Sequence, residues 1–211
     1  MFFDVVVLLL GFEPGPLVRA VASCNLRVGG RVIVFMPSFR DERAERAWSD
    51  FCRILNMMFN GGRVSVERVE VDLTDIVTAV RRVRSVLNSI SNMNTVIVFT
   101  GGMRALVLSV FIAYLLVEWK VKPKLKVYLE GRGYTIDIPD LTTVLSLDIS
   151  REKLRILETL IDKPRTVSEI ARKLGKDRST IHRHIDWLQR KNLVERENKT
   201  FKLTSIGKLL T

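Results

Sequence analysis

Cysteine is scarce in this chain of 211 residues, which contains two, Cys24 and Cys52. Zinc sites and disulfide frameworks need more cysteines than this, at short and regular spacings. We therefore expect no metal site. The sequence leaves a single disulfide open but favours buried thiols in an intracellular protein, where disulfides are rare.

Long apolar segments are also absent. The uncharged apolar run Ala105–Val117 has 13 residues, whereas a helix needs roughly 20 apolar residues to cross a bilayer. The N-terminus is apolar, but it carries Asp4 and lacks the basic region of a secretory signal peptide. We expect a protein of the cytoplasm with no membrane partner.

Histidine occurs only near the end of the chain. The two histidines are His182 and His184, so the first 150 residues contain no histidine to serve as a general base. Their spacing does not place both on one face of a helix, as a metal site would need. The glycine turns of the first 150 residues do not match GxGxxG or GxxxxGKS/T, which mark dinucleotide sites and phosphate-binding loops.

Apolar and basic residues are both plentiful. At 47% hydrophobic and 8% aromatic residues the chain can build a core, and its length suits one medium and one small domain, at roughly 100–150 residues per domain. Lys and Arg number 34 against 23 Asp and Glu, a net charge of +11. Residues 151–211 contain 16 Lys and Arg against 8 Asp and Glu, a net charge of +8. This charge favours contact with a phosphate backbone.

Residues 166–191 have the pattern of two short helices joined by a tight turn. Thr166 and Glu169 have the spacing of a capping box, which predicts where the first helix begins. Gly175 suits the left-handed residue that ends this helix, and Asp177 is expected to cap the second. The apolar residues that repeat at helical spacing are Val167, Ile170, Ala171, Leu174, Ile181, Ile185 and Leu188.

This pattern is typical of a helix-turn-helix, whose second helix enters the DNA major groove. A helix over 151–162, capped by Ser150, precedes it, and two strands, Val194–Arg196 and Phe201–Leu203, and a helix from Ser205 follow, the order of a winged helix. We predict double-stranded DNA as a partner; the alternative is a small helical bundle with a solvated basic face. The residues expected to contact DNA are Arg165, Arg178, Ser179, Thr180, His182, Arg183, Arg190 and Lys199.

The first part of the chain alternates strand and helix. This alternation predicts an α/β fold with a Rossmann-like, open and mainly parallel sheet over 1–139, a connector over 140–150 and a winged helix-turn-helix domain over 151–211. Asp75 is expected to cap one of the helices. Strands are expected over 5–10, 32–36, 64–71, 95–99, 125–129 and 134–138, and helices over 14–24, 42–59, 75–89 and 103–119.

Ligands of such sheets bind at the carboxyl ends of the strands, where helix N-termini offer free amide groups. Paired glycines in the turns there let the backbone approach an anion, and Thr100 and Arg104 add a hydroxyl and a cationic fork. The alternative is that these turns merely join strands to helices. The residues expected to form a ligand site are Leu10, Gly11, Phe12, Glu13, Pro37, Ser38, Thr100, Gly101, Gly102, Met103 and Arg104.

The motifs Gly11-Phe12, Pro37-Ser38, Thr74-Asp75 and Thr100-x-Gly102-x-Arg104 make the first domain resemble a CARF domain. With a winged helix after it, the chain resembles the archaeal CRISPR-associated transcriptional regulators built from these two modules. Val98 is a departure, because the family often has an acidic residue there and this chain lacks that acid. The resemblance implies a homodimer with a symmetric cleft for a cyclic oligoadenylate effector, foremost cyclic tetra-adenylate, and winged helices that bind promoter DNA.

Three functional classes stay open. We favour a ligand-responsive transcription regulator. In the second class, a ring nuclease, Ser38, Thr100 and Arg104 would position a ribose 2′-hydroxyl and stabilise a charged phosphorane, but we predict no catalytic residue. The third class is a regulator that senses an unrelated metabolite or nucleotide.

The predicted helix over 103–119 is apolar nearly all round. Such a helix must be buried on two sides. One side would face its own sheet, and the other either a dimer partner or neighbouring helices of the same subunit.

Overall fold

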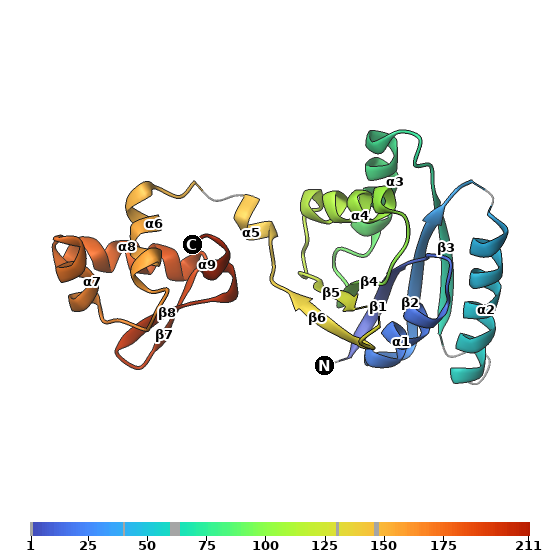
Figure 1. Ribbon diagram of the computed structural model, residues 1–211, viewed down its shortest axis with the longest axis horizontal. Helices are drawn as coiled ribbons and strands as arrows, with labels where there is room; N and C mark the ends of the chain where they lie inside the picture. The colour runs from blue at the N-terminus through green and yellow to red at the C-terminus, as the bar shows by residue number, and fades with distance from the viewer. Residues whose placement is uncertain (1, 40, 60–63, 130, 146–147) are drawn as a thin grey trace. The chain divides into compact units, whose positions relative to one another are not determined.

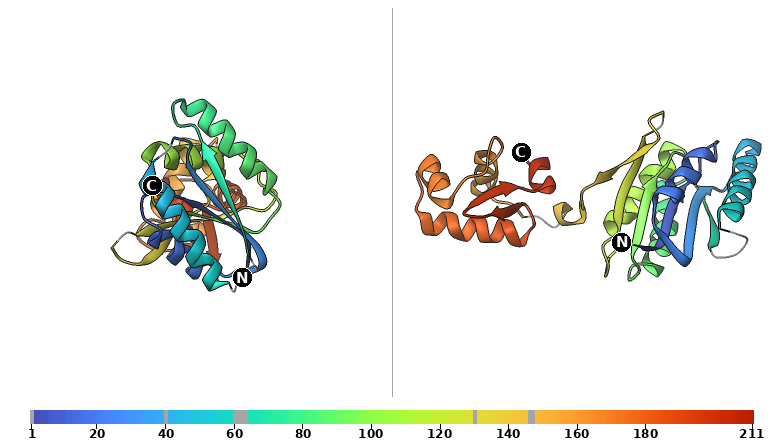
Figure 2. Two further views of the ribbon diagram at one scale, coloured as in Figure 1. Left: turned by 90° about the vertical axis from the view of Figure 1, so that its right-hand side faces the viewer. Right: turned by 90° about the horizontal axis from the view of Figure 1, so that it is seen from below.

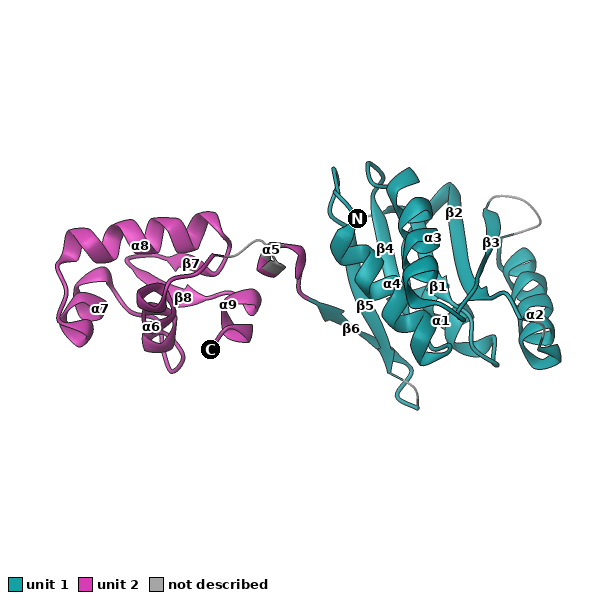
Figure 3. Ribbon diagram, turned by 90° about the horizontal axis from the view of Figure 1, so that it is seen from above, with its two compact units in different colours: residues 1–138 teal, residues 139–211 magenta. Residues whose placement is uncertain are grey.

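The computed structural model describes residues 2–39, 41–59, 64–129, 131–145 and 148–211. They form two compact units, Met1–Ile138 and Pro139–Thr211 (Figure 3). Residues 146 and 147 of the predicted connector lie outside the described residues. In the described part of the chain, no helix is both long enough and apolar enough to cross a membrane.

The first unit is a six-stranded sheet with the order β3-β2-β1-β4-β5-β6. All neighbouring strands run parallel except β5 and β6, which form an antiparallel pair. This architecture confirms the predicted Rossmann-like, mainly parallel sheet. The strands are β1 (Phe3–Leu9), β2 (Leu26–Pro37), β3 (Ser65–Val71), β4 (Thr95–Phe99), β5 (Lys124–Leu129) and β6 (Tyr134–Ile138).

Helices cover both faces of this sheet (Figure 1 and Figure 2). Alternate residues of β1 enter two different cores: Val5, Val7 and Leu9 pack with α3 and α4, whereas Val6 and Leu8 pack with α1 and α2. A strand that is buried on both faces needs apolar residues at every position, and the Val-rich run of β1 supplies them. The helices are α1 (Gly15–Ser23), α2 (Glu42–Met58), α3 (Ile76–Ser89) and α4 (Arg104–Leu116).

Polar bonds hold the two ends of β1. At its start, the Asp4 carboxylate accepts a hydrogen bond from the Asn94 amide at 3.0 Å and forms an ion pair with Arg27 at 2.7 Å. At its end, the side-chain hydroxyl of Thr100 donates to the Leu9 carbonyl at 2.8 Å. Side-chain bonds at both ends of β1 therefore add to its backbone pairing with β2 and β4.

Three element boundaries differ from the sequence prediction by three residues or more, and one of them is the end of α6 (Arg151–Thr159), which was predicted at residue 162. Strand β2 begins at Leu26, which pairs with Phe3, and not at Val32. The residues in between are mostly exposed, so they lack the apolar signal of a buried strand. Helix α4 ends at Leu116 instead of residue 119, because Val117 is extended and the Trp119 indole donates to the Tyr114 carbonyl at 2.9 Å.

The described residues of the second unit form five helices, α5 to α9, and a two-stranded hairpin; α6, α7, α8, the hairpin and α9 follow the predicted order. The core joins the apolar faces of α6, α7 and α8 to Phe201 and Leu203 of the hairpin. A short backbone pairing of Arg165 with Phe201 ties the loop before α7 to the hairpin. The elements are α5 (Thr142–Leu145), α6 (Arg151–Thr159), α7 (Val167–Leu174), α8 (Arg178–Arg190), β7 (Val194–Glu197), β8 (Thr200–Leu203) and α9 (Ser205–Leu209).

The helix ends test the predicted caps. The capping box of Thr166 and Glu169 is present, and Gly175 has the predicted left-handed conformation at φ 62°. Asp75 accepts a hydrogen bond from the Thr78 amide, as predicted. Ser150 and Asp177 occupy the predicted N-cap positions, but their side chains do not form the capping hydrogen bond.

Candidate functional site

A cavity of about 480 Å³ opens at the carboxyl end of the sheet. The loops after β1, β2 and β4 form it, and β1 and β4 are the neighbours at which the strand order reverses direction. This is the place where α/β sheets bind ligands. Nine of the eleven predicted ligand residues line it, namely Leu10, Gly11, Phe12, Glu13, Pro37, Thr100, Gly101, Gly102 and Met103.

The other two predicted residues, Ser38 and Arg104, do not line this cavity. Both are exposed, and the Ser38 amide donates to the Val71 carbonyl at 2.9 Å. The position of a residue in a turn does not fix the direction of its side chain, which explains the difference. The trio of Ser38, Thr100 and Arg104 is thus not gathered in the cavity.

Nine lining residues were missed by the sequence analysis. Arg19 and Tyr128 lie within α1 and β5, away from any turn motif, so local sequence patterns give no signal for them. Phe39 and Asp41 follow the predicted Pro37-Ser38 turn and could have been found by extending it. The missed residues are Gly15, Pro16, Leu17, Arg19, Phe39, Asp41, Ala44, Tyr128 and Gly131.

The loops after β1 and β4 meet through their backbones. A Cβ atom on Gly11 would lie 3.1 Å from the Gly102 nitrogen, and one on Gly102 would lie 3.0 Å from the Leu10 carbonyl oxygen. Gly102 also has φ +94°, which side-chain-bearing residues rarely adopt. Glycine at both positions therefore permits the contact that forms this part of the cavity wall.

Thr100 has a structural partner. Its hydroxyl donates to the Leu9 carbonyl at 2.8 Å and accepts from the Leu9 amide at 3.4 Å, and the residue is 2% exposed. A hydroxyl has one proton, and Leu9 takes it. In this arrangement Thr100 extends the bonding between β4 and β1 and has no proton to donate to an anion.

The N-termini of three helices approach the cavity with different electrostatics. Asp41 caps α2: burial opposes its ionisation, but hydrogen bonds from the Arg43 and Ala44 amides lower the pKa of Asp41 below its ordinary value. Helices α1 and α4 have neither a side-chain cap nor an acidic residue in the first turn. Their free amides and helix dipoles therefore favour an anion.

The predicted DNA-binding face lies on α8 and the hairpin turn. Arg178, Ser179, His182, Arg183 and Arg190 are exposed on α8, as is Lys199 in the turn between β7 and β8. These side chains are accessible to a partner, as the prediction requires.

The remaining two predicted DNA contacts are half-buried. Thr180 lies beside the small hollow between α6 and α8. Arg165 uses its Nε to donate to the Thr159 carbonyl at 2.6 Å, at the end of α6. Arg165 thus has a structural bond through its Nε.

Acidic side chains lie beside basic residues on this face and pair with some of them. The His182 Nδ1 lies 3.0 Å from an Asp186 carboxylate oxygen. In the hairpin, Glu197 and Glu195 pair with Lys202, and the hydrogen bond from Lys202 to Glu197 is the main reason that the pKa of Lys202 is raised. Lys199 is exposed in the turn between β7 and β8 and belongs to neither of these pairs.

His184 lies on the inner side of α8. Its Nε2 is 3.5 Å from the Glu152 carboxylate, which also pairs with Lys176 at 3.0 Å. The hydrogen bond from Lys176 is the largest cause of the lowered pKa of Glu152. This network connects α6 to the turn before α8, so His184 has a packing role.

Comparison with protein families gives two matches that divide the chain between them. The family described as the Csa3 CRISPR-associated Rossmann-like domain matches residues 4–139. The N-terminal domain of the methanogenesis regulatory protein FilR1 matches residues 141–211. A comparison with curated proteins found no significant match.

The solved structures that are similar to this chain include the following two. A Listeria innocua protein of unknown function shares 32% identity, covers 33% of this chain and 52% of its own, and has a TM-score of 0.29. Can2 from Sulfobacillus thermosulfidooxidans, in complex with cyclic tetra-adenylate, shares 16% identity over 98% of this chain and 63% of its own, with a TM-score of 0.44. The chain thus spans about half to two thirds of the length of these relatives.

Proposed function

Since the chain belongs to the family of the Csa3 CRISPR-associated Rossmann-like domain, we propose that it is a CRISPR-associated transcription regulator that binds a cyclic oligoadenylate in its first unit and promoter DNA with its second. The observation that carries this proposal is the cavity at the β1 and β4 switch point, where nine predicted ligand residues meet. Its size lies in the range of roughly 300–1,000 Å³ typical of small-molecule sites.

The chemistry of the cavity suits a nucleotide. Exposed aromatic rings offer stacking surfaces for bases, and the uncapped N-terminus of α1 favours phosphate. Cyclic tetra-adenylate is the first ligand to test, because Can2 is seen with it and a four-membered ring has the two-fold symmetry of a homodimer.

The second unit supports DNA binding by charge and by shape. It carries most of the excess positive charge of the chain, and the exposed side chains of α8 include Arg178, Arg183 and Arg190. A second helix of this kind reads the major groove while basic residues of the hairpin contact phosphates. Arg183 lies near the centre of the exposed face and is the proposed specificity contact.

A homodimer is proposed through α4. This helix buries one side in its own unit and packs on α3, yet Leu108, Ile112 and Leu116 are 55%, 36% and 50% exposed. Their spacing of four residues puts them on one stripe. Neighbouring helices of the same subunit leave this stripe uncovered, and a second copy would bury it.

Calorimetric titration of the full chain with cyclic tri-, tetra- and hexa-adenylate tests the ligand, with ATP as a control nucleotide. We expect binding of cyclic tetra-adenylate in particular. If no cyclic oligoadenylate binds but an unrelated metabolite retained on purification does, the third functional class replaces this one. Product analysis of the labelled ligand tests the ring nuclease.

Titration of operator DNA with and without saturating ligand tests the regulation. Coupling between sites is typically about 1–3 kcal/mol, so ligand should change DNA affinity by roughly 5- to 150-fold. DNA must change ligand affinity by the same factor. An identical DNA titration with and without ligand would contradict the regulatory function.

A further inference from the structure

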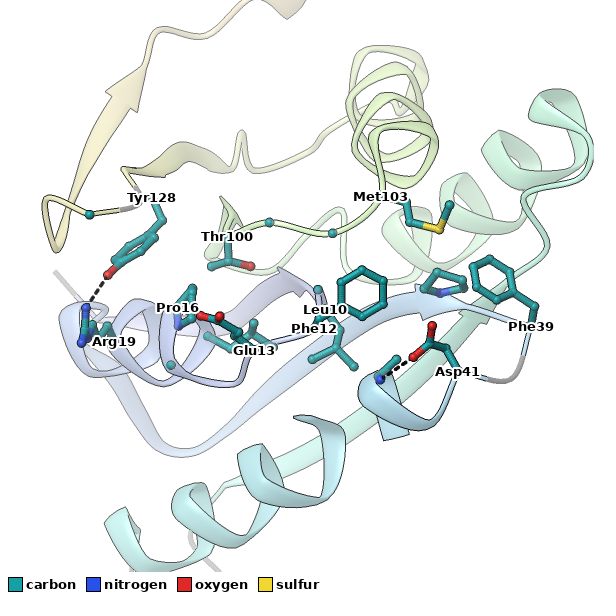
Figure 4. A pocket seen from close by; sticks show the side chains of 18 residues that line it. Leu10, Phe12, Glu13, Pro16, Arg19, Phe39, Asp41, Thr100, Met103 and Tyr128 are labelled. Atoms are coloured by element: carbon teal, nitrogen blue, oxygen red, sulfur yellow. Dashed lines mark hydrogen bonds between the residues drawn. The ribbon is translucent and has the colours of Figure 1, made fainter. Parts of the chain in front are cut away.

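The cavity separates two kinds of side chain (Figure 4). Phe12, Phe39 and Met103 lie at one end, and Arg19 and Tyr128 lie together at the other. The carboxylate of Glu13 lies between the two ends. From one end of the cavity to the other, these side chains provide an apolar surface, a hydrogen-bond acceptor and a cation.

The apolar end is unusual for its exposure. Phe12, Phe39 and Met103 are 49%, 49% and 40% exposed, although large apolar side chains are normally stabilised by burial. They come from the loops after three different strands and meet at one cavity. The most direct reason for such a cluster is an apolar ligand group that covers it.

Phe12 is held in place from outside the cavity. The Arg43 guanidinium lies 4.3 Å from the centre of the Phe12 ring, a cation–π contact. Arg43 also lies 3.6 Å from the Asp41 carboxylate, which lines the cavity at this end. A fixed ring suits stacking of a base, and the neighbouring carboxylate disfavours a phosphate here.

The polar end contains an arginine side chain that is held by a hydrogen bond. Among the described residues that line the cavity, Arg19 is the one Lys or Arg. Its NH1 donates to the Tyr128 hydroxyl at 3.1 Å, and Tyr128 is 6% exposed, so its ring is fixed by packing. Accepting from Arg19 leaves the hydroxyl its own proton to donate. The pair therefore presents several donors and one positive charge, which suits a phosphate.

We infer that the cavity binds a nucleotide of its ligand in one orientation, with the base on Phe12, Phe39 and Met103 and the phosphate on Arg19, which Tyr128 positions. The carboxylate of Glu13 accepts hydrogen bonds from ribose hydroxyls between them. This inference rests on the proposed function. It also gives Arg19 the phosphate contact that the sequence analysis gave to Arg104.

The test is calorimetric binding of cyclic tetra-adenylate by the full chain at low and high salt. Arg19→Gln should weaken binding by roughly 10- to 150-fold, the factor for a hydrogen-bonded charged group, and should flatten the salt dependence. Tyr128→Phe should weaken binding less and keep the salt dependence, because the charge of Arg19 remains. Phe12→Leu should weaken binding by roughly 5- to 150-fold with an unchanged salt dependence.

Arg104→Gln is the matched control, since it removes the same charge outside the cavity. It should leave the affinity close to that of the wild type. Adenosine and 5′-AMP, used as monomer probes, separate the two ends: Phe12→Leu should weaken both, whereas Arg19→Gln should weaken 5′-AMP alone. Unchanged melting temperatures and DNA affinities of the free variants would show that they fold.

Two outcomes overturn different statements. If the wild type binds cyclic tetra-adenylate, and Arg19→Gln binds like the wild type while Arg104→Gln does not, the orientation is wrong and the proposed function stands. If the wild type binds no cyclic oligoadenylate, the proposed function fails and the inference with it.

Discussion

Replacing Thr100 by valine would separate a structural role of its hydroxyl from a role in ligand binding. Valine keeps the shape of threonine but leaves the Leu9 carbonyl and amide, both buried, without the partner they have now. A buried polar group left unsatisfied costs about 1–3 kcal/mol. Because the bond from the Leu9 amide is long, at 3.4 Å, we expect Thr100→Val to lower the free energy of unfolding by about 1–3 kcal/mol in total.

Urea unfolding followed by tryptophan fluorescence measures this change. The chain has three tryptophans, Trp48, Trp119 and Trp187, so a Trp187→Phe background leaves the signal to the first unit. We expect the midpoint to fall by on the order of 1 M without a change in the slope m. Thr100→Ser is the control, since it keeps the hydroxyl and removes one methyl group, at a cost of about 0.8 kcal/mol.

The opposite result would refute this reasoning. If Thr100→Val unfolds at the wild-type urea concentration but binds cyclic tetra-adenylate more weakly, the hydroxyl serves the ligand and not Leu9. A loss of stability with Thr100→Val that Thr100→Ser shows in equal measure would point to packing instead of the hydrogen bond.

Three further predictions concern DNA binding, assembly and acid stability. Arg183→Ala should weaken binding to a specific DNA site by about 1–3 kcal/mol. Lys199→Ala should instead weaken binding to all DNA sequences similarly and flatten the salt dependence of binding. The prediction is contradicted if both variants lose the same affinity for specific DNA as for random DNA. Leu108→Glu should turn the dimer into a monomer in sedimentation, while Leu209→Glu, at a leucine of similar exposure in the second unit, should not. Hydrogen bonds from the Thr166 amide and hydroxyl lower the pKa of Glu169 in the folded protein. The Glu169 carboxylate therefore contributes its full stability above the pKa that it has in the unfolded chain. This contribution is lost as the pH falls through the lower pKa of the folded protein. Glu169→Gln should therefore make the second unit lose less stability in acid than the wild type, and parallel pH curves would show that the capping box does not contribute.

Local patterns in the sequence predicted the features that depend on neighbours along the chain. The capping box at Thr166 and the left-handed Gly175 involve residues within one helical turn. The buried strand β1 follows from a run of apolar residues, because such a run fits a sheet covered on both faces. These signals are present in the sequence without knowledge of the fold.

The rest of the site depends on contacts between distant segments. Arg19 and Tyr128 are 109 positions apart, and their hydrogen bond exists because α1 and β5 meet at the cavity. No local pattern distinguishes Arg19 from other exposed arginines. Conversely, Arg104 sits in a recognisable turn motif, but it is the first residue of α4 and does not line the cavity.

The bonds at the two ends of β1 have a consequence for folding. In a strand with one apolar face, a slip by one residue would expose that face to water, so hydrophobic burial fixes the pairing. β1 is apolar on both faces, and a slipped pairing would bury nearly as much. The correct pairing is then distinguished by Asp4 with Asn94 at one end and Thr100 with Leu9 at the other. We expect chains that lack either bond to populate misaligned intermediates and to refold more slowly, even where the final native state is retained.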